Sequence, residues 1–211
     1  PGAVFGLFDA KDTKIQEATS KADGSVVFTK IPYGSYTIRE ISAPYGYHPS
    51  KEEWKVEVDG TYVNPTTLLA TVENQPAPGR IKILKQDELD KHVIAGVQFD
   101  IFTVGADGKP GDLVTKMTTG KDGIAESPDL FPADYFVQEH ANPTGYTDQL
   151  WSEKITVGMD ETITRTVNNM PVQGRIRIVK TDSETGKGLP GAVFTVTRIS
   201  GLPSHNGEND G

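Results

Sequence analysis

The chain has 211 residues with a formal net charge of −8 at pH 7, and it contains no cysteine. A protein that binds the nucleic-acid backbone needs clustered Lys and Arg, so this acidic balance argues against nucleic acid as a partner. The sequence holds no run of roughly 18 apolar residues, so we expect no membrane insertion in this fragment. Without cysteine, no disulfide can link the strands, and the sequence does not indicate whether the protein is in an oxidising or a reducing compartment.

Several motifs recur in one order along the chain, which indicates tandem modules. A box that reads as a strand followed by a turn occurs as YTIREISAPYGY at 36–47 and YFVQEHANPTGY at 135–146. Shorter motifs also recur, namely GRIKILKQD (79–87) and GRIRIVKTD (174–182), and PGAVF (1–5), AGVQF (95–99) and PGAVF (190–194).

These repeats predict three modules, which are a module lacking its first strand (1–76), a complete module (77–172), and the first strands of a third module with a polar tail (173–211). The joints between modules are short and contain proline, so we expect a semi-rigid rod. Apolar residues follow period two, and the breaks carry Gly, Pro, Asp and Asn, which predicts all-β sandwich modules. Residues 12–22 are an exception, and their pattern predicts a short helix or a loop.

In the second module, apolar rows end in polar residues, with Lys85 on the first strand, Glu139 on a middle strand and Asn169 on the last. Taken alone, Lys85 is more simply explained as an edge lysine whose amine reaches solvent. Burying three polar groups without partners is costly, however, so we expect the three side chains to meet. A site of low dielectric favours the neutral, nucleophilic amine and the protonated carboxyl. The amine can then attack the carboxamide while the carboxyl shuttles protons, which releases ammonia and leaves an amide.

The other modules carry incomplete versions of this set. The first has Glu40 and Asn74 without a lysine, and the third has Lys180 without partners. About five residues separate Asn169 from Gly174 and span at most roughly 17 Å, so Lys180 is not expected to reach Asn74 within one molecule. We therefore expect the strand around Lys180 of one molecule to complete the open first module of another by strand addition.

Four of these motifs together resemble the CnaB family, whose members are also called SpaA-type or prealbumin-like repeats. They are the K-x-D first strand, the G-A-x-F second strand, the Y-x-h-x-E-x-x-x-P-x-G-Y box and the terminal V-x-N, and they cover nearly the whole chain. The resemblance implies Ig-like, prealbumin-like sandwich modules of Gram-positive surface adhesins and pilins, extracellular and anchored to the cell wall in the full-length protein. It also implies a spontaneous isopeptide bond between Lys85 and Asn169, with Glu139 as the proton shuttle.

The leading interpretation is a structural stalk that forms its cross-link once and is not a turnover enzyme. The alternative is a module that binds a glycan or the host matrix, which exposure of Trp54 or Trp151 on a flat face would favour. Recurrence of the two tryptophans in equivalent strands favours packing instead. Other parts of the protein remain candidates for binding a host-matrix protein or glycan. The histidines are scattered and the acidic turns lack EF-hand spacing, so we expect no metal, and no motif suggests a cofactor.

Overall fold

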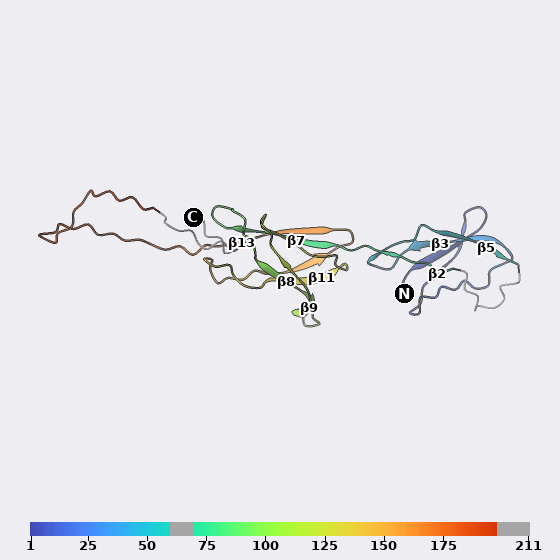
Figure 1. Cartoon of the computed structure of the whole chain (residues 1–211). Helices are drawn as coiled ribbons and strands as arrows, with labels where there is room; N and C mark the ends of the chain where they lie inside the picture. Colours follow the sequence, from blue (N-terminus) through green and yellow to red (C-terminus); the bar gives the residue numbers. More distant parts are fainter. Residues whose placement is uncertain (60–69, 198–211) are drawn as a thin grey trace. The chain divides into compact units, whose positions relative to one another are not determined.

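A computed structural model describes residues 1–59 and 70–197, and within these ranges the chain contains β-strands and no helix (Figure 1). The prediction of an all-β sandwich protein is confirmed. In the described part of the chain, no helix is long and apolar enough to cross a membrane. Two compact units are present, of which unit 1 comprises residues 1–80, 128–133 and 156–162, and unit 2 comprises 81–127, 134–155 and 163–211. The division into three modules and the rod shape stay predictions.

Unit 1 is built on a four-stranded antiparallel sheet in the order β2-β1-β3-β5. Its strands are β1 (Val4–Phe8), β2 (Lys14–Thr19), β3 (Gly34–Ser42) and β5 (Glu53–Val58). A short pairing of β4 (Tyr47–His48) with β6 (Gln75–Pro76) adds a second, two-stranded sheet. The strand-and-turn box therefore supplies most of β3, in which Glu40 is the buried residue.

The prediction of a helix or loop over residues 12–22 is wrong, because β2 occupies Lys14–Thr19. Its backbone pairs with β1 from Val4↔Thr19 to Phe8↔Lys14, with one irregularity in the register. The side chains of β2 are exposed or half-buried. Hydrogen bonding to β1 therefore fixes this edge strand, and burial of its side chains contributes little.

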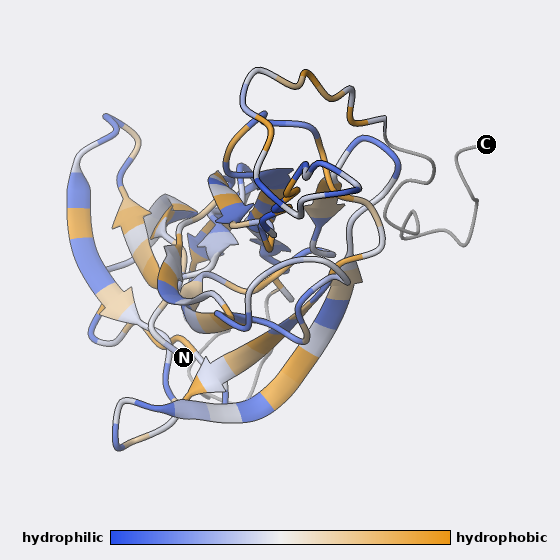
Figure 2. Cartoon of the chain, turned by 90° about the vertical axis from the view of Figure 1, so that its left-hand side faces the viewer, coloured by the Kyte–Doolittle hydropathy of each residue, from blue (hydrophilic) through white to orange (hydrophobic). Residues whose placement is uncertain are grey.

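Unit 2 contains two sheets, one in the order β12-β11-β8-β9 and one in the order β10-β7-β13. The strands are β7 (Arg80–Asp87), β8 (Gln98–Val104), β9 (Pro110–Thr118), β10 (Ile124–Glu126), β11 (Ala133–Glu139), β12 (Ser152–Val157) and β13 (Thr162–Asn169). Hydrophobic and hydrophilic residues alternate along the strands (Figure 2), as expected where one face of each strand meets a core. Buried side chains from both sheets form that core, including Ile81, Ile83, Phe99, Ile101, Val137, Ile155 and Val167.

The first and last strands of unit 2, β7 and β13, are neighbours and run parallel. Near one end of the pair, Arg80 N donates to Glu161 O over 2.7 Å, and near the other end Glu88 N donates to Asn169 O over 3.0 Å. From the first bond to the second, the donor and the acceptor both advance by the same number of residues along the chain. Only a parallel pair of strands gives this pattern. Arg165 lies on β13 in the same alternating row as Val167 and Asn169. A charged residue is tolerated there because β13 is an edge strand, and Arg165 forms an ion pair with Glu153 over 2.7 Å.

Residues 173–197 form an irregular hairpin, drawn without arrows in Figure 1, with an isolated bridge between Thr181 and Gly188. The strands predicted here are absent from the described residues. Apolar side chains of this segment are exposed, with Ile176 at 76% and Val193 at 94%. The structure provides no neighbouring strands along this stretch, so its alternating pattern has no sheet to join. The predicted polar tail, residues 201–211, lies outside the described residues.

Candidate functional site

The side chain of Lys85 lies inside unit 2, on the row that it shares with Ile81 and Ile83, and all three residues are 0% exposed. An ammonium group loses its hydration when it is enclosed in this way. Burial therefore lowers the pKa of Lys85 from 10.5 to about 8, although the neighbouring Glu139 carboxylate acts in the opposite direction. A larger fraction of this amine is neutral near pH 7 than for an ordinary lysine.

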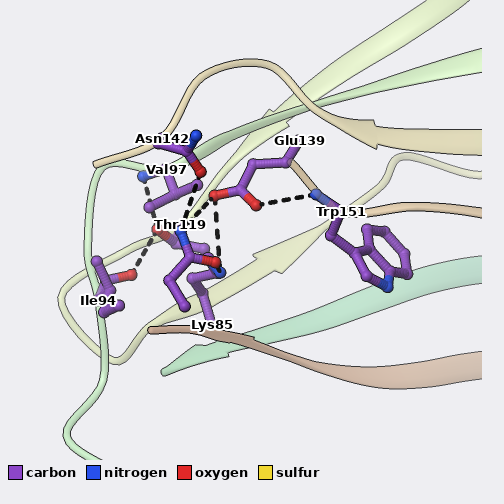
Figure 3. Close-up of polar contacts among 8 residues, drawn as sticks. Lys85, Ile94, Val97, Thr119, Glu139, Asn142 and Trp151 are labelled. Atoms are coloured by element: carbon purple, nitrogen blue, oxygen red, sulfur yellow. Dashed lines mark hydrogen bonds and ion pairs between the residues drawn. The ribbon is translucent and has the colours of Figure 1, made fainter. Parts of the chain in front are cut away.

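Lys85, Glu139 and Asn169 come from three strands and meet in the core. Figure 3 shows Lys85 and Glu139 in this arrangement. The Nζ of Lys85 contacts Oδ1 of Asn169. The Nδ2 of Asn169 donates to Oε1 of Glu139 over 3.0 Å, and the same oxygen lies 3.6 Å from Nζ of Lys85. One carboxylate oxygen thus faces both nitrogen atoms that would exchange a proton if the amine attacked the carboxamide.

The carboxylate of Glu139 is held in place by the segment that follows β11. Its Oε2 accepts from Trp151 N over 3.5 Å, while Glu139 N donates to Trp151 O over 2.9 Å. The ring of Trp151 packs edge-on against Phe99, with centroids 6.1 Å apart. In unit 1, Trp54 packs on Phe5 with ring centroids 6.5 Å apart and the rings tilted by 49°. Both tryptophans are half-buried and pack against a phenylalanine, as their recurrence in equivalent strands predicts.

Two further residues near the site were not predicted from the sequence. Asn142 places Oδ1 3.5 Å from Nδ2 of Asn169, and it is half-buried at the edge of the site (Figure 3). Thr119 is buried and links Ile94 O (2.8 Å) to Val97 N (2.9 Å). Asn142 lies in the strand-and-turn box, but the first copy has Ala43 at this place, so the repeat gave no signal for it.

Unit 1 brings together its carboxylate and its carboxamide. The Nδ2 of Asn74 donates to Oε2 of Glu40 over 2.6 Å and to His48 O over 3.0 Å, and Glu40 is 7% exposed. Ser50 N donates to the same Oε2 over 2.6 Å. The hairpin carries Lys180, which is exposed and donates to the carbonyl of its neighbour Thr181 over 3.1 Å.

A cluster of two carboxylates and one imidazole follows β7. The ligand atoms of Asp87, Asp90 and His92 lie within 4.8 Å of one another. Asp87 accepts from Leu89 N over 2.7 Å, and Asp90 Oδ1 lies 2.5 Å from His92 Nδ1. Turn formation accounts for these contacts, so we assign no metal to the cluster.

Comparison with known proteins places this chain in a family. The prealbumin-like fold domain called SpaA matches residues 1–71 and 79–171. Serine-aspartate repeat-containing protein D of Staphylococcus aureus (strain Newman) is 29% identical over 154 residues, which is 64% of this chain and 11% of that protein. Trypsin-resistant surface T6 protein of Streptococcus pyogenes serotype M6 is 33% identical over 55 residues, 26% of this chain and 10% of that protein. The chain thus spans about a tenth of the length of these relatives.

Solved structures show the same architecture. The Bacillus anthracis TIE protein has a TM-score of 0.66 and 26% identity, covering 80% of this chain and 30% of that one. The C-terminal fragment of the pilus adhesin SpaC from Lactobacillus rhamnosus GG has a TM-score of 0.51 and 16% identity, covering 83% and 92%. The second likeness shows the fold alone. With the family match extending over most of its length, the chain belongs to the SpaA family of prealbumin-like fold domains.

Proposed function

We propose that the chain supplies stalk modules of a bacterial cell-surface adhesin or pilin, and that an amide between Lys85 Nζ and Asn169 Cγ locks unit 2. The observation that carries this proposal is the buried meeting of an amine, a carboxamide and a carboxylate. Lys85 and Glu139 have fully buried side chains, and Asn169 is 4% exposed. Burying three such polar groups costs free energy, and clusters of this kind are typical of functional sites.

The bond forms in one event. The neutral amine of Lys85 attacks Cγ of Asn169, and a Cγ–Nζ bond forms while the Cγ–Nδ2 bond breaks. Glu139 takes a proton from Nζ and gives it to Nδ2, so ammonia leaves and the carboxylate is restored. Distances of 3.6 Å and 3.0 Å from Oε1 to the two nitrogen atoms suit this transfer. No turnover follows, because the amine and the carboxamide are consumed.

Two physical effects raise the rate. With a pKa of about 8, on the order of one tenth of Lys85 is neutral at pH 7, a far larger share than for a solvated lysine. The fold also holds the reacting groups in contact, which replaces the entropy loss of an encounter between free molecules. A folded unit 2 therefore contains what the reaction needs, and unfolded chain does not.

We infer the cellular location of the full-length protein from its relatives. The family match and the similarity to a surface protein of Streptococcus pyogenes support an extracellular position. We place the full-length protein at the cell surface, anchored to the cell wall, with host-matrix or glycan binding assigned to other parts. In this arrangement the modules of this chain are spacers.

Intact mass under denaturing conditions tests the cross-link. The chain should weigh less than its sequence by one ammonia, and Lys85→Ala or Asn169→Ala should each restore the full mass. Asn74→Ala and Lys180→Ala are matched controls, which should retain the deficit. Digestion should also yield a branched peptide that joins the segments around Lys85 and Asn169. Full sequence mass in the unmodified chain would contradict the proposal.

A further inference from the structure

The carboxylate of Asp87 has one contact that the turn after β7 does not explain. Asp87 follows Lys85 by two positions on β7, so the two side chains lie on the same buried face, and Asp87 is 3% exposed. Its Oδ1 accepts from Leu89 N over 2.7 Å and from Asp90 N over 3.2 Å, and these two bonds form the turn. The carboxylate also accepts a hydrogen bond from the hydroxyl of Tyr146, the last residue of the second strand-and-turn box. A buried charge is thus linked to a distant segment of the chain.

The hydroxyl of Tyr146 is held in a polar, partly enclosed position. Its oxygen lies 3.2 Å from Nε2 of His92 as well as in hydrogen-bonding contact with Asp87, and the tyrosine is half-buried. Burial and the negative charge of Asp87 raise the pKa of Tyr146 above its ordinary value of 10.0, so the hydroxyl keeps its proton and is the donor. A hydrogen bond to a charged acceptor is stronger than one between neutral groups, so this contact ties Tyr146 firmly to the end of β7.

The segment around Tyr146 also holds the chain that follows β13. Residues 145–147 pair with residues 170–172 through two backbone hydrogen bonds, of 3.0 Å and 2.8 Å, and an isolated bridge. The paired segment begins directly after Asn169, the last residue of β13. At the end of β7, Glu88 N donates to Asn169 O over 3.0 Å. The backbone around Asn169 is therefore tied both to β7 and to the segment that carries Tyr146.

We propose that the hydrogen bond between Tyr146 and Asp87 positions the carboxamide of Asn169 for the attacking amine. The inference rests on the cross-link proposed for unit 2, and it makes Tyr146 and Asp87 positioning residues of that reaction. In the described part of the chain β13 has β7 as its one neighbouring strand, and Asn169 is its terminal residue, where a strand opens most easily. Because β7 also carries Lys85, a bond that fastens the end of β13 to β7 aligns the two reacting side chains. A misplacement of about 1 Å can slow a reaction on the order of a hundredfold.

Removal of one hydroxyl tests this role. Tyr146→Phe keeps the ring, and after refolding in acid and transfer to neutral pH the variant should lose ammonia roughly 10 to 100 times more slowly than the unmodified chain. Its final mass should be the same. The rate should still level off above the Lys85 pKa of about 8, because the amine keeps its surroundings. Tyr47→Phe, at the same place in the first box, is the matched control and should not alter the rate. An unchanged rate for Tyr146→Phe, or a displaced pH profile, would overturn the positioning role.

A double-mutant cycle checks that the two residues act through one bond. Asp87→Asn keeps one oxygen for the turn and loses the carboxylate that accepts from the Tyr146 hydroxyl. This variant should slow the loss of ammonia about as much as Tyr146→Phe does. The double variant should be no slower than either single variant, because both changes remove the same interaction. Effects that multiply in the double variant would show that the residues act independently, contrary to the inference.

Hydrogen exchange tests the same bond without the cross-link. In the Lys85→Met chain, which cannot form the amide, Tyr146→Phe should speed exchange of the Thr147 and Val172 amides on the order of tenfold. The amides of β8, in the core, should exchange as before. Unchanged exchange at Thr147 and Val172 would refute the inference even where the cross-link forms. Full sequence mass in the unmodified chain would instead refute the cross-link, and the exchange data would then show separately whether this bond holds the end of β13.

Discussion

Lys85 and Asn169 touch in the core of unit 2 although 84 positions separate them in the chain. The contact joins the first strand of the unit to the last and closes a loop that contains every strand between them. A covalent link at this point therefore constrains the unfolded chain over nearly the whole unit.

Loss of the link should lower the stability of unit 2. Lys85→Met removes the amine and keeps an unbranched apolar side chain of similar length in the core. By analogy with loop closure by a disulfide, the free energy of unfolding should fall by about 4 to 5 kcal/mol. For a domain of this size, the thermal midpoint should drop on the order of 20 °C in calorimetry. Lys180→Met, at an exposed lysine, is the control and should not shift the midpoint. Equal midpoints for the three proteins would exclude a stabilising link.

Glu139 should control the rate of bond formation. Glu139→Gln preserves the shape of the side chain but removes the group that carries the proton. Loss of a general acid or base typically slows a reaction by about 10²- to 10⁴-fold. The variant should therefore fold and keep most of its full mass long after the unmodified chain has reacted. Glu40→Gln is the matched control in unit 1, and it should leave the reaction of unit 2 unaffected.

Bond formation should accelerate as pH rises. The protonated amine of Lys85 has no lone pair for attack, and burial lowers its pKa to about 8. Below that pH the neutral fraction grows about tenfold per unit, and above it the fraction levels off. Chain refolded in acid and then transferred to a series of pH values should lose ammonia with this profile, as followed by intact mass. A rate that keeps rising up to the ordinary lysine pKa of 10.5 would show that Lys85 is not desolvated.

Asn142 should have a smaller, positional effect. Its Oδ1 lies 3.5 Å from Asn169 Nδ2, a long contact that orients the carboxamide without taking part in proton transfer. A hydrogen bond of this kind contributes roughly 1 kcal/mol, so Asn142→Ala should slow the reaction about fivefold and leave the final mass unchanged. Thr144→Ala, at an exposed position of the same turn, should not alter the rate.

The sequence predicts the buried row that carries Lys85, because the pleat of a strand makes the row periodic. Lys85 follows Ile81 and Ile83 at intervals of two, and burial of this row at 0% exposure agrees with that pattern. Asn142 has no such signature, since it lies in a turn and its counterpart is Ala43. Its role depends on how the turn folds back toward β13, which no local pattern encodes.

Strands held by their neighbours are the elements that the sequence misjudges. β2 carries no apolar row, and its pairing with β1 is what makes it a strand. The converse holds for residues 174–180, which repeat the pattern of β7 but form no strand. β7 has hydrogen-bonded strands on both sides, whereas in the described structure residues 174–180 pair with no strand, and Lys180 O at their end accepts from Leu189 N over 2.9 Å. Alternation shows which side chains would share a face, but only neighbouring strands supply the sheet.

The parallel course of β7 and β13 determines how unit 2 responds to tension. Chain enters at the start of β7 and leaves at the end of β13, so a stretching force runs along both strands in one direction. With Lys85 joined to Asn169, the force crosses between the strands through side chains, and the 84-position loop carries no load. An unlinked unit would release about 280 to 300 Å of contour length when pulled open. The linked unit stays inextensible.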